Sequence, residues 1–339
     1  MKFGINVNVH FSPELSAPRA FEYAVRHVRA AREGGFDGIF AAHHYALGSG
    51  EALFQPFPLL ARLAAEANGM TMGTSIFLLS LHNPLEAAEL AATLDIITGG
   101  RFVFGVGQGY RDVEFASFGI PRSRRRGRLE EAVQVIRKLW AEDGVTWQGD
   151  HFPLQGVTIN PKPVQQPGPA IWVGGDTLLG VRRAADIGDA WMTSPRHSKG
   201  FIRQALEVYK ERRLSLGLSV PPPVFFREMY VARSREEAER EMVESFERLY
   251  QVYHREGQPG ERYDRSFQEL QEDRIIMGSP EDVRQEIQTY RDEFGAEYMF
   301  FRVYYLGMDP EKAVQCVRLF GEEVIPHFAS TQAPSGFLD

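Results

Sequence analysis

Segments typical of β-strands alternate with segments typical of α-helices along almost the whole 339-residue chain, and this alternation limits the choice of fold more than any other feature. The predicted strands cover residues 2–9, 35–45, 70–78, 101–106, 170–174, 190–193, 224–232 and 298–304. A predicted helix follows each of them. Strands and helices in this order build parallel sheets, because a helix crosses over between successive strands. Eight such units favour a closed (β/α)8 TIM barrel over an open, doubly wound sheet.

Two stretches interrupt the alternation, and we expect both to be insertions in a single domain. After the fourth helix, two short apolar runs at residues 145–147 and 157–159 predict a hairpin. Residues 254–273, after the seventh strand, are highly charged and contain glycine and proline, which is typical of a mobile segment. This segment is expected to be either a lid over a pocket or a disordered surface loop. The domain is predicted to span residues 1–328, with a C-terminal tail at 329–339.

The composition argues against several classes of protein. The formal net charge is −7 and the isoelectric point is about 5.8, so a nucleic-acid partner or an anionic membrane surface is not expected. The single cysteine, Cys316, permits neither an intramolecular disulfide nor a thiolate metal cluster, which fits a reducing cytoplasm. The N-terminus resembles a strand rather than a signal peptide, and no apolar run reaches the roughly 18 residues that suggest a membrane span.

Two adjacent histidines, His43 and His44, end the second predicted strand. The carboxyl ends of strands are the places where parallel α/β folds carry chemistry, and imidazole exchanges protons near neutral pH. The alternatives are that the pair only lines a pocket or that it binds a metal. A shared metal ion is not expected, because adjacent residues of a strand point to opposite faces.

Several short motifs follow one another in a fixed order along the chain. They are Gly35-Phe36-Asp37 with His43-His44, Asn83-Pro84 through Leu94-Asp95, Gly99-Gly100-Arg101-Phe102, Phe104-Gly105-Val106-Gly107 with Glu114-Phe115, Arg126 with Glu130 and Leu139-Trp140, Gly278-Ser279-Pro280-Glu281, and Val324-Ile325-Pro326. Together they resemble the bacterial luciferase-like family of flavin-dependent monooxygenases and oxidoreductases. The resemblance covers almost the whole chain and implies the same barrel fold.

The resemblance implies a catalytic pair and a support for the flavin ring. His43 corresponds to the catalytic histidine of the luciferase branch, which exchanges protons while reduced flavin reacts with oxygen, and His44 is its neighbour. The family usually has a glutamate before the pair, where this chain has Ala42. The bond between Ser75 and Ile76 corresponds to a non-prolyl cis peptide that supports the middle of the isoalloxazine ring.

The resemblance also implies a site for the flavin phosphate. Arg126 and the turn Gly175-Asp176-Thr177 correspond to the residues that grip it. A turn that leads into a helix N-terminus suits an anion, because the first N–H groups of a helix are free. Gln108 stands where the luciferase branch has a second phosphate-binding arginine, and Arg182–Arg183 are candidates to compensate. Tyr110 is expected to line the same pocket.

The implied activity is the monooxygenation of a small organic substrate, in which reduced FMN from a separate flavin reductase reacts with O2 to form a C4a-peroxyflavin. The alternative is hydride transfer by an oxidoreductase that uses the deazaflavin F420. A second alternative is a non-catalytic flavin-binding protein. The resemblance further implies a homodimer formed through helices at residues 56–67 and 85–97, which carry more alanine and leucine than one buried face requires.

Overall fold

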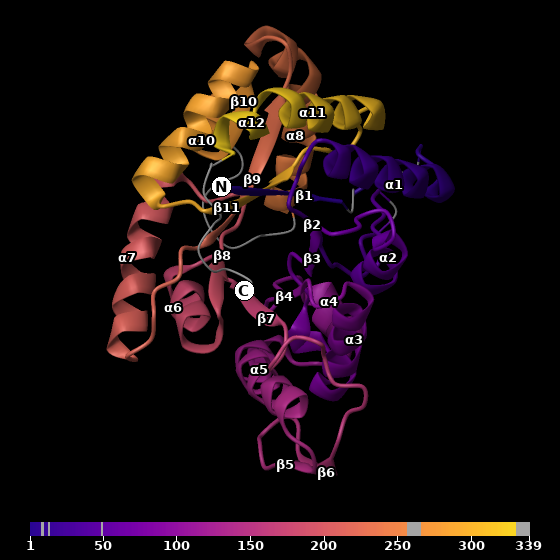
Figure 1. The fold of residues 1–339 in the computed structure, drawn as a ribbon, viewed down its shortest axis with the longest axis vertical. Helices are drawn as coiled ribbons and strands as arrows, with labels where there is room; N and C mark the ends of the chain where they lie inside the picture. Colours follow the sequence, from indigo (N-terminus) through magenta and orange to yellow (C-terminus); the bar gives the residue numbers. More distant parts are fainter. Residues whose placement is uncertain (8–9, 13, 49, 256–265, 330–339) are drawn as a thin grey trace.

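The computed structural model describes residues 1–7, 10–12, 14–48, 50–255 and 266–329, which fold around a closed parallel barrel (Figure 1). The barrel strands are β1 (Lys2–Asn6), β2 (Gly38–Ala41), β3 (Thr71–Thr74), β4 (Phe102–Val106), β7 (Ala170–Gly174), β8 (Ala190–Met192), β9 (Val224–Val231) and β11 (Tyr298–Arg302). Each strand pairs in parallel with its neighbours in the ring, and pairing of β8 with β9 closes it. The predicted (β/α)8 barrel is confirmed.

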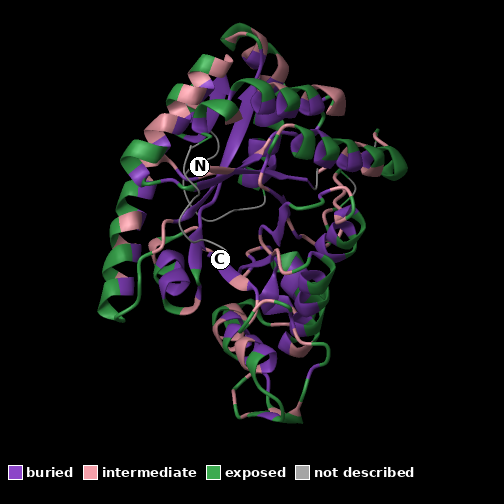
Figure 2. Ribbon diagram, in the orientation of Figure 1, coloured by how far each residue is buried: buried purple, intermediate pink, exposed green. Residues whose placement is uncertain are grey.

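Helices pack around the outside of the barrel (Figures 1 and 2). The longer ones are α1 (Ala17–Glu33), α2 (Pro56–Leu63), α3 (Pro84–Ile97), α5 (Arg125–Ala141), α6 (Leu178–Ile187), α7 (Lys199–Ser215), α8 (Arg235–Arg255), α10 (Pro280–Phe294) and α11 (Pro310–Glu323). Helix α10 shows why these segments form helices where they do. Ser279 and Asp282 cap its first turn reciprocally, and Gly295 ends it in the left-handed conformation. No helix in the described ranges combines the length and apolarity that a membrane crossing needs.

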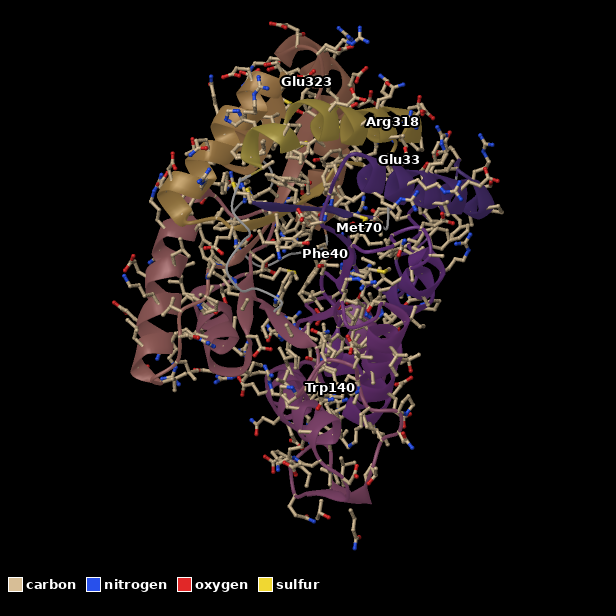
Figure 3. The ribbon with its side chains drawn as sticks, in the orientation of Figure 1. Glu33, Phe40, Met70, Trp140, Arg318 and Glu323 are labelled. Carbon is tan, nitrogen blue, oxygen red and sulfur yellow. The ribbon has the colours of Figure 1, made fainter. Side chains whose placement is uncertain are left out.

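Aromatic side chains fill the interior of the barrel. Phe40 lies near the centre of the molecule (Figure 3), with its ring centroid 4.5 Å from that of Phe300 and 5.6 Å from that of Trp172. Phe300 in turn stacks on Phe226 at 4.4 Å. These residues come from β2, β7, β9 and β11, so one packed layer ties four strands together.

Two local features differ from the sequence-based expectation. Residues 267–273, predicted to be part of a mobile segment, belong to helix α9 (Phe267–Arg274), whose Phe267 and Leu270 are buried. An additional strand, β10 (Ile275–Gly278), follows and pairs with the second half of β9, beyond the point where β8 ends. Residues 256–265 of the expected lid and 330–339 of the expected tail lie outside the described ranges.

The insertion after α5 is a hairpin, as predicted. The hairpin consists of β5 (Val145–Trp147) and β6 (Leu154–Val157), so its second strand begins earlier than expected. It projects from the end of α5, away from the barrel axis (Figure 1). A short helix, α4 (Asp112–Ser117), which was not predicted, lies between β4 and α5.

Candidate functional site

A pocket of about 480 Å³ opens where the strands β2, β3, β4 and β7 end. Its wall includes the main candidates for catalysis and cofactor binding: His43, His44, Ser75, Ile76, Gln108, Tyr110, Arg126, Gly175, Asp176 and Thr177. The fold therefore brings all of these candidates together. Of the pair Arg182–Arg183, Arg183 lines the pocket, whereas Arg182 is exposed and does not. The volume is in the range of pockets that bind small molecules and cofactors.

A bulge after β3 forms one side of the pocket. The Ser75–Ile76 peptide bond is cis, and Asn6 donates a hydrogen bond to the Ser75 hydroxyl at 2.9 Å. Neighbouring glycines leave the space that the bulge occupies. A side chain on Gly105 would overlap the backbone of Thr74, and one on Gly107 would overlap Ile76. Only glycine at these two positions allows so close an approach.

His43 is deeply buried and its tautomer is defined by its surroundings. The main-chain N–H of Leu78 donates to Nδ1 of His43 at 3.2 Å, so the neutral ring carries its proton on Nε2. Burial, with smaller contributions from His82 and His44, lowers the pKa of His43 to about 3. Its Nε2 is buried and makes no hydrogen bond of normal geometry within the described residues, although Gln55 lies near enough to oppose the fall in pKa. His43 is thus suited to donating a hydrogen bond to a ligand rather than to accepting a proton.

His44 has a different environment, because a carboxylate contacts it. Glu114, a fully buried residue of α4, lies with Oε1 2.9 Å from Nδ1 of His44 and accepts the main-chain N–H of Tyr45 at 3.0 Å. The guanidinium of Arg111 lies 3.6 Å from the same oxygen. A carboxylate that accepts from Nδ1–H leaves Nε2 of His44 as a proton acceptor. His44 therefore has a carboxylate partner although the residue before the pair is Ala42.

The turn after β7 forms the opposite side of the pocket. Thr177 caps helix α6, and its hydroxyl accepts the N–H of Gly180 at 3.2 Å. Gly175 packs directly against Gly180, where a side chain on Gly175 would clash with the backbone. The helix therefore points its N-terminus, with its partial positive charge, toward the pocket wall formed by Gly175, Asp176 and Thr177.

Arginines gather beside this helix N-terminus. Arg125, the first residue of α5, has a buried Nε with no partner within the described residues. Burial and the neighbouring charges of Arg122 and Arg183 lower the pKa of Arg125, which indicates like-charge repulsion that an anion would relieve. Arg126 also lines the pocket, but its side chain is 68% exposed and pairs with Glu130 at 2.8 Å.

Arg183 lies next to the position where an arginine was expected and glutamine is found. It is 8% exposed and donates to Gln108 at 3.2 Å and to Glu130 at 3.0 Å. The helix N-terminus, Arg125 and Arg183 therefore bring positive charge and N–H donors to one part of the pocket wall, as an anion would require.

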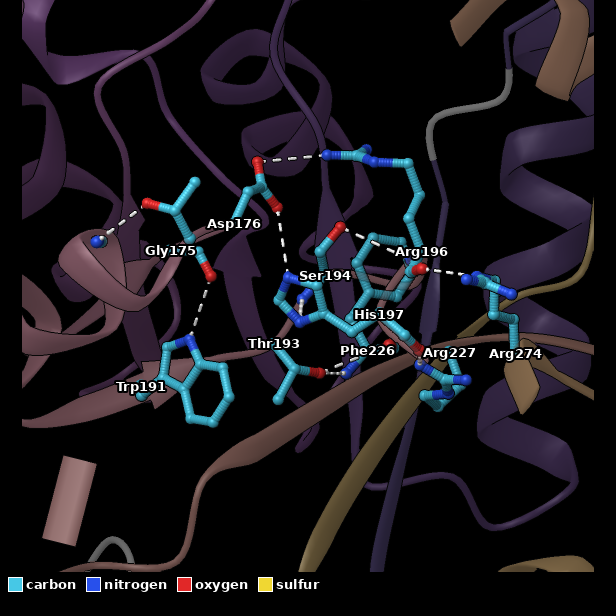
Figure 4. Close-up of polar contacts among 12 residues, drawn as sticks. Gly175, Asp176, Trp191, Thr193, Ser194, Arg196, His197, Phe226, Arg227 and Arg274 are labelled. Atoms are coloured by element: carbon cyan, nitrogen blue, oxygen red, sulfur yellow. Dashed lines mark hydrogen bonds and ion pairs between the residues drawn. The ribbon is translucent and has the colours of Figure 1, made fainter. Parts of the chain in front are cut away.

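Asp176, although acidic, does not oppose an anion at this site. Its carboxylate pairs with Arg196 at 3.1 Å and lies 3.7 Å from His197 (Figure 4). His197 accepts the N–H of Ser194 through Nδ1, and burial lowers the pKa of His197 to about 3. The Arg196 charge thus neutralises Asp176, and the buried His197 stays uncharged at neutral pH.

Comparison with known proteins agrees with this geometry. The sequence profile of the luciferase-like monooxygenases matches residues 1–297. The chain belongs to the luciferase-like monooxygenase family. Its structure superimposes on a monooxygenase, RslO1 from Streptomyces bottropensis, with a TM-score of 0.82 and 28% identity, covering 97% of this chain and all of that one.

The names of curated relatives of this chain mention two different cofactors, F420 and FMNH2. One is an F420-dependent glucose-6-phosphate dehydrogenase from Intrasporangium calvum, 31% identical over 59% of this chain and 61% of that protein. Another is an FMNH2-dependent dimethylsulfone monooxygenase from Pseudomonas putida, 27% identical over 58% of this chain and 50% of that protein. The chain thus spans less than two thirds of the length of each of these relatives.

Two residues of the site were not predicted from the sequence. Glu114 appeared only as part of a motif, and Arg125 was not singled out among the arginines of residues 122–128, of which only Arg126 was assigned a role. A search for an acidic residue within a short helix after the fourth strand could have found Glu114. Nothing in the run of arginines distinguishes Arg125 from Arg126, because their difference lies in which side of α5 packs against the barrel.

Proposed function

We propose that this protein is a flavin-dependent monooxygenase that oxidises a small organic substrate with reduced FMN and O2. The observation that carries the proposal is that one pocket is lined by the turn before α6 with Arg125 and Arg183, by the cis Ser75–Ile76 bond, and by His43 and His44. These three groups suit, respectively, the phosphate, the ring and the reacting end of a flavin mononucleotide. Similarity to a solved monooxygenase over nearly the whole chain supports it.

Each side chain has a role in this proposal. Arg125, Arg183 and the N–H groups at the start of α6 bind the phosphate, and the bulge supports the ring. The bound cofactor supplies the electrons that activate oxygen. His43 donates a hydrogen bond from Nε2, whereas His44, oriented by Glu114, takes up or releases a proton. A separate flavin reductase supplies the reduced cofactor.

The second candidate is an F420-dependent oxidoreductase that transfers hydride without oxygen. The curated relative that depends on F420 favours it. So does the positive charge of the pocket wall, which includes Arg122, Arg125, Arg126, Arg183, Arg196 and Arg302 against the acidic Glu51 and Asp176. A cofactor with several negative charges would complement this excess of arginine.

Anaerobic titration of the purified protein with FMN, reduced FMN and F420 separates these candidates. We expect micromolar affinity for reduced FMN and much weaker binding of F420. Tight binding of F420 with none of FMN in either redox state would replace the first proposal by the second. Binding of flavin without any substrate-dependent consumption of O2, across a panel of small organic compounds, would indicate a non-catalytic flavin-binding protein.

We also propose that the protein is a homodimer that uses the outer face of α3. Leu90, Ile96 and Ile97 of this helix are large apolar residues with 37%, 40% and 47% of their surfaces exposed. A second copy of the chain would remove this apolar surface from water.

A further inference from the structure

A second histidine–carboxylate pair lies in the same pocket, and the proposed function does not use it. Nδ1 of His10 lies 3.0 Å from Oε2 of Glu51, and both residues line the pocket. His10 follows β1, whereas Glu51 lies in the loop between β2 and α2. Their side chains are 19% and 8% exposed, so the pair is largely removed from water yet faces the pocket.

The pair is not needed to hold its two segments together. The adjoining residues Phe11 and Ala52 form an antiparallel bridge and exchange both main-chain hydrogen bonds, at 3.1 and 2.9 Å. The rings of Phe11 and Phe54 add a contact with centroids 5.2 Å apart. Because the backbone already fixes this arrangement, the His10–Glu51 contact is available to set the orientation of the imidazole.

His10 also lies close to the first pair. The ring centroids of His10 and His44 are 6.1 Å apart in an edge-to-face arrangement, so the two imidazoles are neighbours in the pocket wall. In each ring Nδ1 faces a carboxylate, which places the proton there and leaves Nε2 as an acceptor. Burial lowers the pKa of His10 against the opposing effect of Glu51, so the ring is neutral at neutral pH. Two acceptors of this kind complement a ligand that carries a hydrogen-bond donor.

We propose that His10, oriented by Glu51, binds the hydroxyl group of the substrate, and that this protein therefore acts on a hydroxyl-bearing organic compound. The hydroxyl donates its hydrogen bond to Nε2 of His10 beside His44. This inference rests on the proposed oxidoreductase function of the pocket, but the orientation of His10 does not. Glu51 acts as a positioning residue, because it contacts His10 rather than the ligand.

Nitrogen NMR of the flavin-free protein labelled with ¹⁵N-histidine tests the orientation. We expect His10 and His44 to carry the proton on Nδ1 and His43 to carry it on Nε2, with signals assigned from single His→Gln variants. Glu51→Gln should change the signal of His10 and leave that of His43 unaltered. A wild-type His10 protonated on Nε2 would overturn the proposal, whether or not the protein binds a flavin.

Binding of para-cresol and of its methyl ether tests the hydroxyl, because the two probes differ in one O–H donor. We expect wild-type protein to bind the cresol about tenfold more tightly, the ratio that one good hydrogen bond provides. His10→Phe and Glu51→Gln should bring that ratio close to one without changing the affinity for FMN. His327→Asn, at an exposed histidine on α12 (Ile325–Phe328), is the matched control and should keep the ratio.

A wild-type ratio near one, including absence of binding by both probes, would refute the assignment of a hydroxyl substrate. Failure of the wild-type protein to bind any flavin would instead refute the proposed function. The NMR result would remain valid in that case, so the two failures are distinguishable.

Discussion

Replacing Arg125 with alanine should weaken the binding of FMN while leaving the binding of riboflavin unchanged, because riboflavin lacks the phosphate. The buried Nε of Arg125 has no partner within the described residues, so it is free to donate to a phosphate oxygen. A hydrogen bond between charged groups contributes about 1.5–3 kcal/mol, which corresponds to a loss of affinity of roughly 10- to 140-fold. Removing Arg125 also removes its repulsion with Arg122 and Arg183. We expect this gain to be smaller than the lost attraction between Arg125 and the phosphate.

Fluorescence titration of wild-type and variant proteins with both flavins measures the effect. The wild-type protein should prefer FMN over riboflavin, and Arg125→Ala should remove most of that preference. Arg124→Ala provides a matched control, because Arg124 is the exposed neighbour in the same run and does not line the pocket. If Arg125→Ala weakens both flavins equally, or if Arg124→Ala has the same effect, the phosphate site has been placed wrongly.

Three further predictions concern stability and assembly. Gly105→Ala should destabilise the fold by about 1–3 kcal/mol in urea unfolding, because its new methyl group would overlap the backbone of Thr74; an unchanged midpoint would contradict this. Burial lowers the pKa of His27 from 6.5 to about 4, so the unfolded chain binds more protons in that window and stability falls as pH decreases from 6.5 toward 4. His27→Leu should reduce that slope by up to about 1.4 kcal/mol per pH unit, whereas an equal slope would show that His27 does not contribute. Leu90→Asp combined with Ile97→Asp should convert a dimer to a monomer in sedimentation at micromolar concentration; a monomeric wild type would refute the interface.

The barrel could be predicted because its signal is repeated. Each strand is an apolar run followed by a helix of ordinary length, and errors in single boundaries do not change the count. Strand β10 could not be predicted in this way, since Ile275–Gly278 is only four residues long and follows a highly charged helix. Its place in the sheet depends on β9 continuing past the end of β8, which is a property of the tertiary fold.

In the candidate site, too, some features follow from local sequence and others depend on the tertiary fold. The positions of His43, Ser75 and Thr177 follow from strand ends and turns, which local sequence indicates well. The difference in tautomer between His43 and His44 does not, because it depends on the N–H of Leu78 and the carboxylate of Glu114. These groups lie 35 and 70 residues away along the chain, and only folding brings them to the imidazole rings.

The position of Glu114 on α4 has a consequence for exchanging loops between relatives. The segment that joins β4 to α5 contributes Gln108 and Tyr110 to the pocket wall, and it also carries the carboxylate that orients His44. A graft of this segment intended to alter ligand preference would also remove the carboxylate that orients His44, which follows a different strand. Grafts that retain a carboxylate at position 114 and a cation at position 111 should preserve the orientation of His44. The ligand preference of the pocket can then be changed without changing that histidine.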